Sequence, residues 1–279
     1  MVKKIIVVGS GNAGMSAAIA ALESGASVLV MEKAEEALAG GNTKYTAGAM
    51  RFCFDGVDSI KRLLRDPDDE RLKRTDLGSY SEDRFLEDLK NFNDGRPLSD
   101  EQKLLVTQSY DAVCWLSDHG VKFDPIFERQ SFEKNGRFVF WGGLAVATAN
   151  EGLGLIEQQM LAFDRLGGKI QYGQNVNGLS TKAGIINGVI VDGRVEKADA
   201  VILASGGFEA NQKMRVSNMG ENWRHAKVRG TPNNTGMGLH LAFELGAMKY
   251  GLYDGCHATP MDLHMPDFGG LDLPPNERK

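Results

Sequence analysis

Residues 4–14, KIIVVGSGNAG, decide the fold of this chain. Ile5–Val8 is a β-branched apolar run, suited to a parallel strand that is buried on both faces. The alanine-rich stretch Ala13–Glu23 contains no proline and predicts a closely packed helix, with Gly25 as its stop. Val28–Glu32 predicts a second strand. The order strand, helix, strand predicts an α/β fold with a parallel central sheet.

The turn between the first strand and the helix has the pattern G-x-G-x-x-G. In a dinucleotide site Gly9 permits the tight turn, Gly11 lets the backbone approach a pyrophosphate, and Gly14 lets helix and strand pack closely. Glu32 at the end of the second strand would accept hydrogen bonds from an adenosine ribose. A purely structural glycine turn is the alternative. The predicted cofactor-binding residues here are Gly9, Ser10, Gly11, Asn12, Ala13, Gly14, Glu32 and Lys33.

The loop that follows the second strand indicates whether the cofactor is FAD or NAD. Residues 40–50, GGNTKYTAGAM, are small and hydroxylated where a simple NAD domain continues into another helix. Such a loop can wrap an extended cofactor, because small residues let the backbone pass a flat ring system. This favours FAD, and an NAD-only dehydrogenase with an irregular connection is the alternative. The residues predicted to contact the cofactor are Gly41, Asn42, Thr43, Thr46, Ala47, Gly48 and Ala49.

Composition and charge argue against several classes of protein. The formal net charge is −5 over 279 residues, so no positive field gathers nucleic acid. No apolar run is long enough to predict a membrane span. Three scattered cysteines without C-x-x-C spacing predict reduced thiols in a cytoplasm and no metal site.

The remaining pattern predicts an interrupted α/β domain. Residues 60–76 carry mixed charge and predict a solvated surface segment. Helices are predicted at residues 82–93, 101–119, 153–166 and 235–246, and strands at residues 169–172 and 200–204. Between these strands, turns at Asn177-Gly178, Asn187-Gly188 and Asp192-Gly193 predict a small antiparallel β-meander.

Four segments together resemble a known family of FAD-dependent flavoproteins, which includes fumarate reductase and succinate dehydrogenase. They are VVGSGNAGMSAA with Glu32, GGNTKYTAGAM, ILASGGFE at residues 202–209 and NTGMG at residues 234–238. Within the family, four further segments are most similar to the tricarballylate dehydrogenases, which oxidise a tricarboxylate to cis-aconitate. These are residues 51–52, 137–143, 228–232 and 255–258.

The resemblance implies a Rossmann-like FAD-binding domain and assigns further roles. Asn175 and Val176 would meet the adenine through backbone groups, and His257 would bind a substrate carboxylate. Asn42 stands where members with covalent flavin carry a histidine, which implies noncovalent FAD. The strand end at Ala204, Ser205 and Gly206 would lie beside the pyrophosphate and adenosine, and Thr235, Gly236 and Gly238 would approach the flavin.

The resemblance also implies a domain organisation. Residues 1–250 would form the FAD-binding domain, with a helical insertion at about 60–145, and residues 251–279 would begin a capping domain. In the family that cap supplies the proton-transferring arginine, so no catalytic residue is assigned here. The implied activity is dehydrogenation of a small polycarboxylate, and the electron acceptor is not identified. The implied active site would be completed by a second polypeptide or by self-association. A noncatalytic FAD-binding fragment or half of a split flavoenzyme is the alternative, and a 3-ketosteroid substrate stays open.

Overall fold

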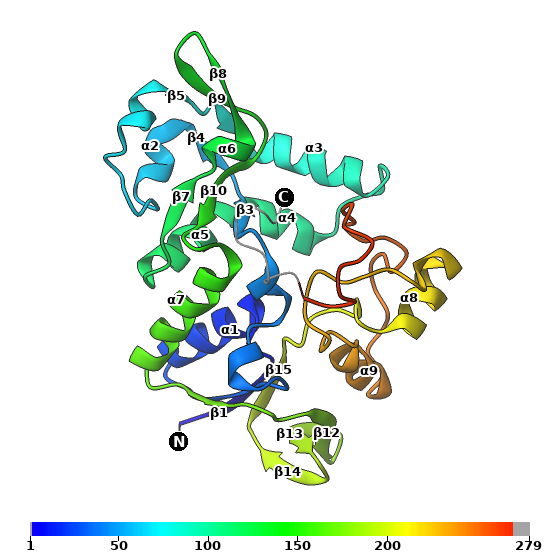
Figure 1. The fold of residues 1–279 in the computed structure, drawn as a ribbon. Coiled ribbons are helices and arrows are strands. Elements are labelled where there is room, and N and C mark those ends of the chain that lie inside the picture. Colours follow the sequence, from blue (N-terminus) through cyan, green and yellow to red (C-terminus); the bar gives the residue numbers. More distant parts are fainter. Residues whose placement is uncertain (1, 270–279) are drawn as a thin grey trace. The chain divides into compact units, whose positions relative to one another are not determined.

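A computed structural model describes residues 2–269 (Figure 1). The chain divides into two compact units. The first is drawn from residues 1–45 and 159–279, and the second is residues 46–158. The boundary expected at residue 250 stays a prediction. Within the described part of the chain, no helix combines the length and the apolar character that crossing a bilayer requires.

A four-stranded parallel sheet forms the centre of the first unit. Its strand order is β11-β2-β1-β15, with every neighbouring pair parallel. Ile6, Val7 and Val30 are fully buried, as expected for strands covered on both faces. The predicted α/β fold with a parallel central sheet is confirmed. The strands are β1 (Lys4–Val8), β2 (Ser27–Met31), β11 (Lys169–Gln171) and β15 (Ala200–Leu203).

Helix α1 (Asn12–Glu23) connects β1 to β2 and packs against both strands. It ends where predicted, because Gly25 adopts a φ of +80° that favours glycine. The amide of Ala26 donates to the carbonyl of Ala21, and the amide of Gly25 donates to that of Leu22. These two bonds form a Schellman motif, which satisfies carbonyl groups left free at the helix end.

The β-meander is present, but two of its predicted turns are wrong. Asn177-Gly178 lies inside β12 and Asn187-Gly188 inside β13, so only Asp192-Gly193 is a turn. The β12–β13 connection is Ala183-Gly184, with φ values of 52° and 77°. Gly188 serves close strand packing instead, since a Cβ there would lie 2.2 Å from the carbonyl oxygen of Glu196. The strands are β12 (Val176–Lys182), β13 (Ile185–Val191) and β14 (Arg194–Lys197).

Several short helices complete the first unit. The helix predicted over residues 235–246 is α9, which begins after Gly236 in a left-handed conformation. Helix α7 (Glu151–Arg165) contributes its residues from Gln159 onward. The others are η1 (Glu36–Leu38), η2 (Gly41–Tyr45), α8 (Gln212–Met219), η4 (Glu221–Trp223) and α9 (Met237–Glu244).

The second unit has its own apolar core, built around Phe52, Tyr80 and Phe123. It contains all of residues 60–145, for which a helical insertion is predicted, and carries strands as well as helices. Its helices are α2 (Gly56–Lys61), η3 (Glu70–Arg74), α3 (Glu82–Phe92), α4 (Asp100–Thr107), α5 (Ser109–Asp118) and α6 (Phe127–Gln130). Its strands are β3 (Ala49–Arg51), β4 (Phe54–Asp55), β5 (Thr75–Asp76), β6 (Ser79–Tyr80), β7 (Phe123–Pro125), β8 (Ser131–Lys134), β9 (Arg137–Phe140) and β10 (Leu144–Thr148).

The single helix predicted over residues 101–119 is wrong, since the structure breaks it at Gln108 into α4 and α5. Just after the break, the buried Ser109 hydroxyl donates to the Val106 carbonyl at 2.7 Å and accepts from the Cys53 amide at 3.0 Å. A serine side chain that binds backbone groups competes with helix continuation. Apolar periodicity does not reveal this competition.

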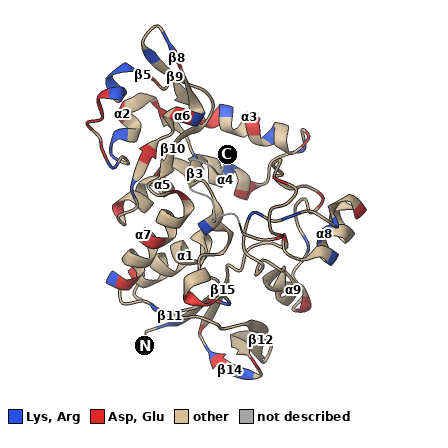
Figure 2. Ribbon diagram, in the orientation of Figure 1, with Lys and Arg blue, Asp and Glu red and all other residues tan. Residues whose placement is uncertain are grey.

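The charged segment at residues 60–76 is largely exposed, as predicted. Figure 2 shows acidic and basic residues alternating between α2 and β5. Arg71 pairs with Asp69 at 2.6 Å, and Lys73 pairs with Glu70 at 2.6 Å. The charges thus pair locally at the surface, which agrees with the predicted solvated segment.

Candidate cofactor site

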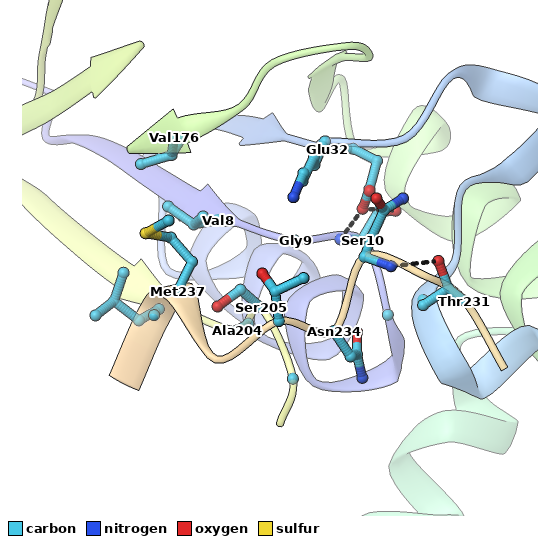
Figure 3. A pocket seen from close by; sticks show the side chains of 18 of the residues that line it. Val8, Gly9, Ser10, Glu32, Val176, Ala204, Ser205, Thr231, Asn234 and Met237 are labelled. Carbon is cyan, nitrogen blue, oxygen red and sulfur yellow. Dashed lines mark hydrogen bonds between the residues drawn. The ribbon is translucent and has the colours of Figure 1, made fainter. Parts of the chain in front are cut away.

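A cavity of about 510 Å³ lies in the first unit, at the carboxyl ends of β1, β2 and β15. This is the edge of a parallel sheet where ligands bind in open α/β folds, and the volume suits a small-molecule site. Figure 3 shows Val8, Val176 and Met237 on one side of it and Ser10 with Glu32 on another. The predicted residues that line it are Gly9, Ser10, Gly11, Asn12, Ala13, Glu32, Lys33, Gly41, Asn42, Thr43, Val176, Ala204, Ser205, Gly206, Thr235 and Gly238.

Two glycines of the first turn are required by the protein itself. Gly9 has a φ of +105°, and a Cβ there would lie 2.5 Å from the carbonyl oxygen of Ala204. A Cβ on Gly14 would lie 1.9 Å from the carbonyl oxygen of Gly9. Both approaches are closer than real Cβ contacts, so these residues fix how strand, turn and helix pack.

Gly11 differs because nothing in the protein requires a glycine there. Its φ of −69° is open to any residue, and a Cβ would meet its nearest atom, Oγ1 of Thr43, at 3.5 Å. That distance is an ordinary van der Waals contact. The missing side chain leaves space at the start of α1, where a dinucleotide needs the backbone to be bare. The cavity therefore fits a dinucleotide diphosphate.

The start of α1 supplies the donors for such an anion. The amide of Asn12 donates to Oγ1 of Thr43 at 3.0 Å, which ties η2 to the helix start. The next amides, of Ala13 and Gly14, have no acceptor within the helix, as at every helix start. No acidic residue lies in the first turn. The positive end of the helix dipole is therefore available to a negative group.

Glu32 has a second role that the sequence did not reveal. It is buried, and its Oε2 accepts from the amide of Ser10 at 2.8 Å and from the Ser10 hydroxyl at 2.6 Å (Figure 3). Its Oε1 accepts from the amide of Ala34 at 2.7 Å. The Ser10 hydroxyl in turn accepts from the amide of Gly40 at 3.1 Å. Glu32 thus braces the glycine turn, and its contact with a ribose stays a prediction.

The far side of the cavity is built where β15 ends against α9. Gly206 has a φ of +74°, and a Cβ there would meet the Asn234 side chain at 2.6 Å. A Cβ on Gly238 would lie 2.3 Å from Oγ of Ser205, so glycine lets α9 begin close to the strand end. Gly236 does not line the cavity, and a Cβ there would meet Sδ of Met214 at 2.5 Å.

Sequence reasoning missed one wall of the cavity. Thr231 is buried, and its amide donates to Oδ1 of Asn42 at 2.9 Å. A polar run immediately before a predicted helix is the signal that indicates this wall. Asn175, predicted with Val176, also lines the cavity, and the unpredicted polar residues that line it are Gln174, Thr231, Asn233 and Asn234.

Four predicted cofactor residues belong to the second unit. The amide of Gly152 donates to the carbonyl of Thr46, and the amide of Thr148 donates to that of Gly48. Gly48 has a φ of +69°, and a Cβ there would lie 2.3 Å from Oγ1 of Thr148. The contacts predicted between the cofactor and Thr46, Ala47, Gly48 and Ala49 stay predictions.

His257 lies in an exposed segment after α9 and does not line the cavity. Its role in binding a substrate carboxylate stays a prediction. Residues 2–269 contain no group of three or more His, Cys, Asp or Glu side chains placed to hold a metal ion.

The chain is similar to known proteins. Residues 4–254 match the model of the FAD binding domain family. The cytochrome-containing fumarate reductase of Shewanella frigidimarina is 30% identical over 269 residues, which are 91% of this chain and 42% of that protein. A vinyl phenol reductase of Lactiplantibacillus plantarum is 27% identical and covers 88% of this chain and 46% of that protein. The chain thus spans less than half the length of these relatives.

Among solved structures, the open conformation of a flavocytochrome c3 fumarate reductase superposes with a TM-score of 0.63. The sequence identity is 23%, over 88% of this chain and 41% of that one. This likeness concerns the fold.

Proposed function

The chain belongs to the family of FAD-binding domains found in fumarate reductase and succinate dehydrogenase flavoproteins, and we propose that it binds FAD noncovalently as part of a polycarboxylate dehydrogenase. The observation that carries the cofactor assignment is the contrast among the three glycines. Gly9 and Gly14 are required by backbone packing, whereas Gly11 lines the cavity at the start of α1 and would tolerate a Cβ at ordinary van der Waals distances. A bound diphosphate explains why a glycine stands there.

Different residues would bind different parts of the cofactor. The first backbone amides of α1 would hold the diphosphate, and the absence of a side chain at Gly11 would let the diphosphate reach these amides. Val8, Val176 and Met237 form an apolar wall suited to the adenine, and Glu32 accepts from the ribose while it braces Ser10. FAD, when bound, supplies the two-electron acceptor.

We propose a small polycarboxylate as the substrate, with tricarballylate oxidised to cis-aconitate. Two hydrogens leave adjacent carbons in that reaction, one with its electron pair to the acceptor and one as a proton to a base. The similarity of residues 137–143, 228–232 and 255–258 to tricarballylate dehydrogenases supports the proposal, with His257 holding one carboxylate. The relatives act on fumarate and on vinyl phenol, which differ in carboxylate content, so family membership leaves the substrate open.

The chain covers 42% of the Shewanella relative, and none of residues 2–269 is assigned as the base. The proposed proton-transferring residue therefore lies outside residues 2–269. The cysteines Cys53, Cys114 and Cys256 are all unpaired, which supports the proposed cytoplasmic location.

Two measurements test this function. The purified chain should show a flavin absorption band, or acquire one on adding FAD. A chain that takes up NAD but not FAD would contradict the proposal. With tricarballylate, succinate or fumarate and an artificial electron carrier, the flavin-loaded chain alone should turn over slowly or not at all. Rapid turnover by the chain alone would contradict the proposed position of the proton-transferring residue outside residues 2–269.

A further inference from the structure

Gln159 of α7 is a fully buried polar residue that contacts the start of α1. Its exposed fraction is 0%, and its amide nitrogen donates to Oδ1 of Asn12 at 2.9 Å and to Oγ of Ser16 at 3.0 Å. Asn12 is the first residue of α1 and lines the cavity. Gln159 does not line the cavity, so it reaches the site only through the residues it holds.

The other end of the Gln159 amide is unpaired. Its Oε1 is buried and has no hydrogen-bond partner among the described residues. An unpaired buried carbonyl is destabilising, so this orientation needs a reason. Turning the Gln159 amide over would place its oxygen against Oδ1 of Asn12, where two acceptors repel. The Asn12 amide would then have to turn over as well, so the two orientations are locked together.

The coupled orientation of the two amides determines which end of the Asn12 amide is left for the cavity. Oδ1 of Asn12 accepts from Gln159 and also, at 3.4 Å, from the Ser16 hydroxyl. The NH2 group on the other arm of the Asn12 amide carries two N–H donors, and neither Gln159 nor Ser16 binds them. Because Asn12 lines the cavity, these donors are the part of its amide that is left for a ligand.

We propose that Gln159 is a positioning residue that holds the Asn12 amide with its N–H donors toward the cofactor diphosphate. The inference rests on the proposed function, since it takes the cavity to bind FAD. With the donors facing inward, Asn12 adds a charge-assisted hydrogen bond to those of the α1 backbone. In the reversed orientation, the Asn12 oxygen would face the phosphate oxygens and repel them. The unpaired carbonyl of Gln159 is the consequence of keeping the first arrangement.

The test is a double-mutant cycle on FAD affinity, measured by flavin fluorescence titration of the apoprotein. Gln159→Met keeps the length of the side chain and removes both its donors and the unpaired carbonyl. We expect it to weaken FAD binding about tenfold, and Asn12→Ala to do the same. In the Asn12→Ala background, Gln159→Met should change the dissociation constant by less than about twofold, because the residue through which it acts is gone.

A stability measurement separates positioning from a merely structural role. Since Gln159→Met removes an unpaired buried acceptor, the melting temperature of the apoprotein should stay unchanged or rise while FAD affinity falls. The matched control is Gln158→Met, one residue earlier on α7. The side-chain amide nitrogen of Gln158 donates to the Gly154 carbonyl at 2.8 Å. This control should leave FAD affinity unchanged.

Two outcomes would overturn the inference while leaving the proposed function intact. In one, Gln159→Met binds FAD as tightly as the unmodified chain. In the other, its effect is as large in the Asn12→Ala background as without it. An unmodified chain that takes up no FAD would instead contradict the proposed function, and this inference with it.

Discussion

The hydroxyl of Ser10 lies 2.6 Å from Oε2 of Glu32, and both side chains are buried between the ends of β1 and β2. The same hydroxyl accepts from the amide of Gly40 at 3.1 Å. One serine therefore connects the glycine turn, the acidic residue of the second strand and the loop after it. The geometry of the candidate site depends on this connection.

Ser10→Ala should destabilise the protein and loosen the turn. The change removes one donor to Glu32 and leaves the amide of Gly40 without its acceptor, so we expect about 2 kcal/mol less unfolding free energy. FAD affinity should fall as well, because the turn is less well held. Urea unfolding and FAD titration check both. Ser24→Ala, at the exposed end of α1, is the control and should change stability by less than about 0.5 kcal/mol. Equal stability of the two variants would contradict this role of Ser10.

Gly11→Val should abolish FAD retention while leaving the apoprotein folded. A Cβ at residue 11 meets the protein only at 3.5 Å, but it occupies the approach to the α1 amides. We expect the dissociation constant for FAD to rise at least about a hundredfold, with little change in the melting temperature. Gly9→Ala, in contrast, should lower the free energy of unfolding by more than about 2 kcal/mol, because residue 9 has a φ of +105° and lies close to the Ala204 carbonyl. Unchanged flavin content in folded Gly11→Val would rule out the assigned site.

The flavin should be released when the loaded protein is denatured. The resemblance to the family implies that Asn42 takes the place of the histidine of covalent members, and an amide is not a nucleophile. Its oxygen is already engaged by the amide of Thr231 at 2.9 Å. Acid precipitation should therefore leave FAD in the supernatant and a colourless pellet. Flavin fluorescence on the denatured polypeptide in a gel would contradict noncovalent binding.

Tyr80 of the second unit should make stability depend on alkaline pH. Its hydroxyl donates to Asp88 at 2.6 Å, and burial, together with this bond, raises the pKa of Tyr80 to about 12. The pKa is higher in the folded state than the value of about 10 in the unfolded chain. The protonated Tyr80 side chain therefore contributes about 2 kcal/mol to the free energy of unfolding below pH 10. This contribution is lost as the pH rises from about 10 to 12.

Urea unfolding at pH 9 and pH 11 measures this effect. Tyr80→Phe should show a smaller loss of stability over that interval than the unmodified chain, because no phenol ionises at this position. Tyr250→Phe, at an exposed position, should keep the full loss. Identical pH dependence in all three proteins would contradict the assignment.

The local pattern of the sequence determined the strand, helix and strand of the first unit, together with the stop at Gly25. These elements depend on contacts close in the chain, such as apolar periodicity and helix capping. The same reasoning erred at Gly178 and Gly188, because a glycine that follows an asparagine satisfies a tight turn and a close strand approach equally well. Only the pairing of β13 with β14 shows which applies at Gly188.

Tertiary structure decided the polar contacts that hold the site. The motif predicted separate roles for Gly9, Gly11 and Gly14, but the backbone groups that exclude a side chain at residues 9 and 14, the carbonyls of Ala204 and Gly9, are identified only by the structure. Nor could the sequence pair Gln159 with Asn12, which are separated by 147 positions. A buried hydrogen bond between distant residues leaves no periodic trace, because it is set by the placement of helices and strands against each other.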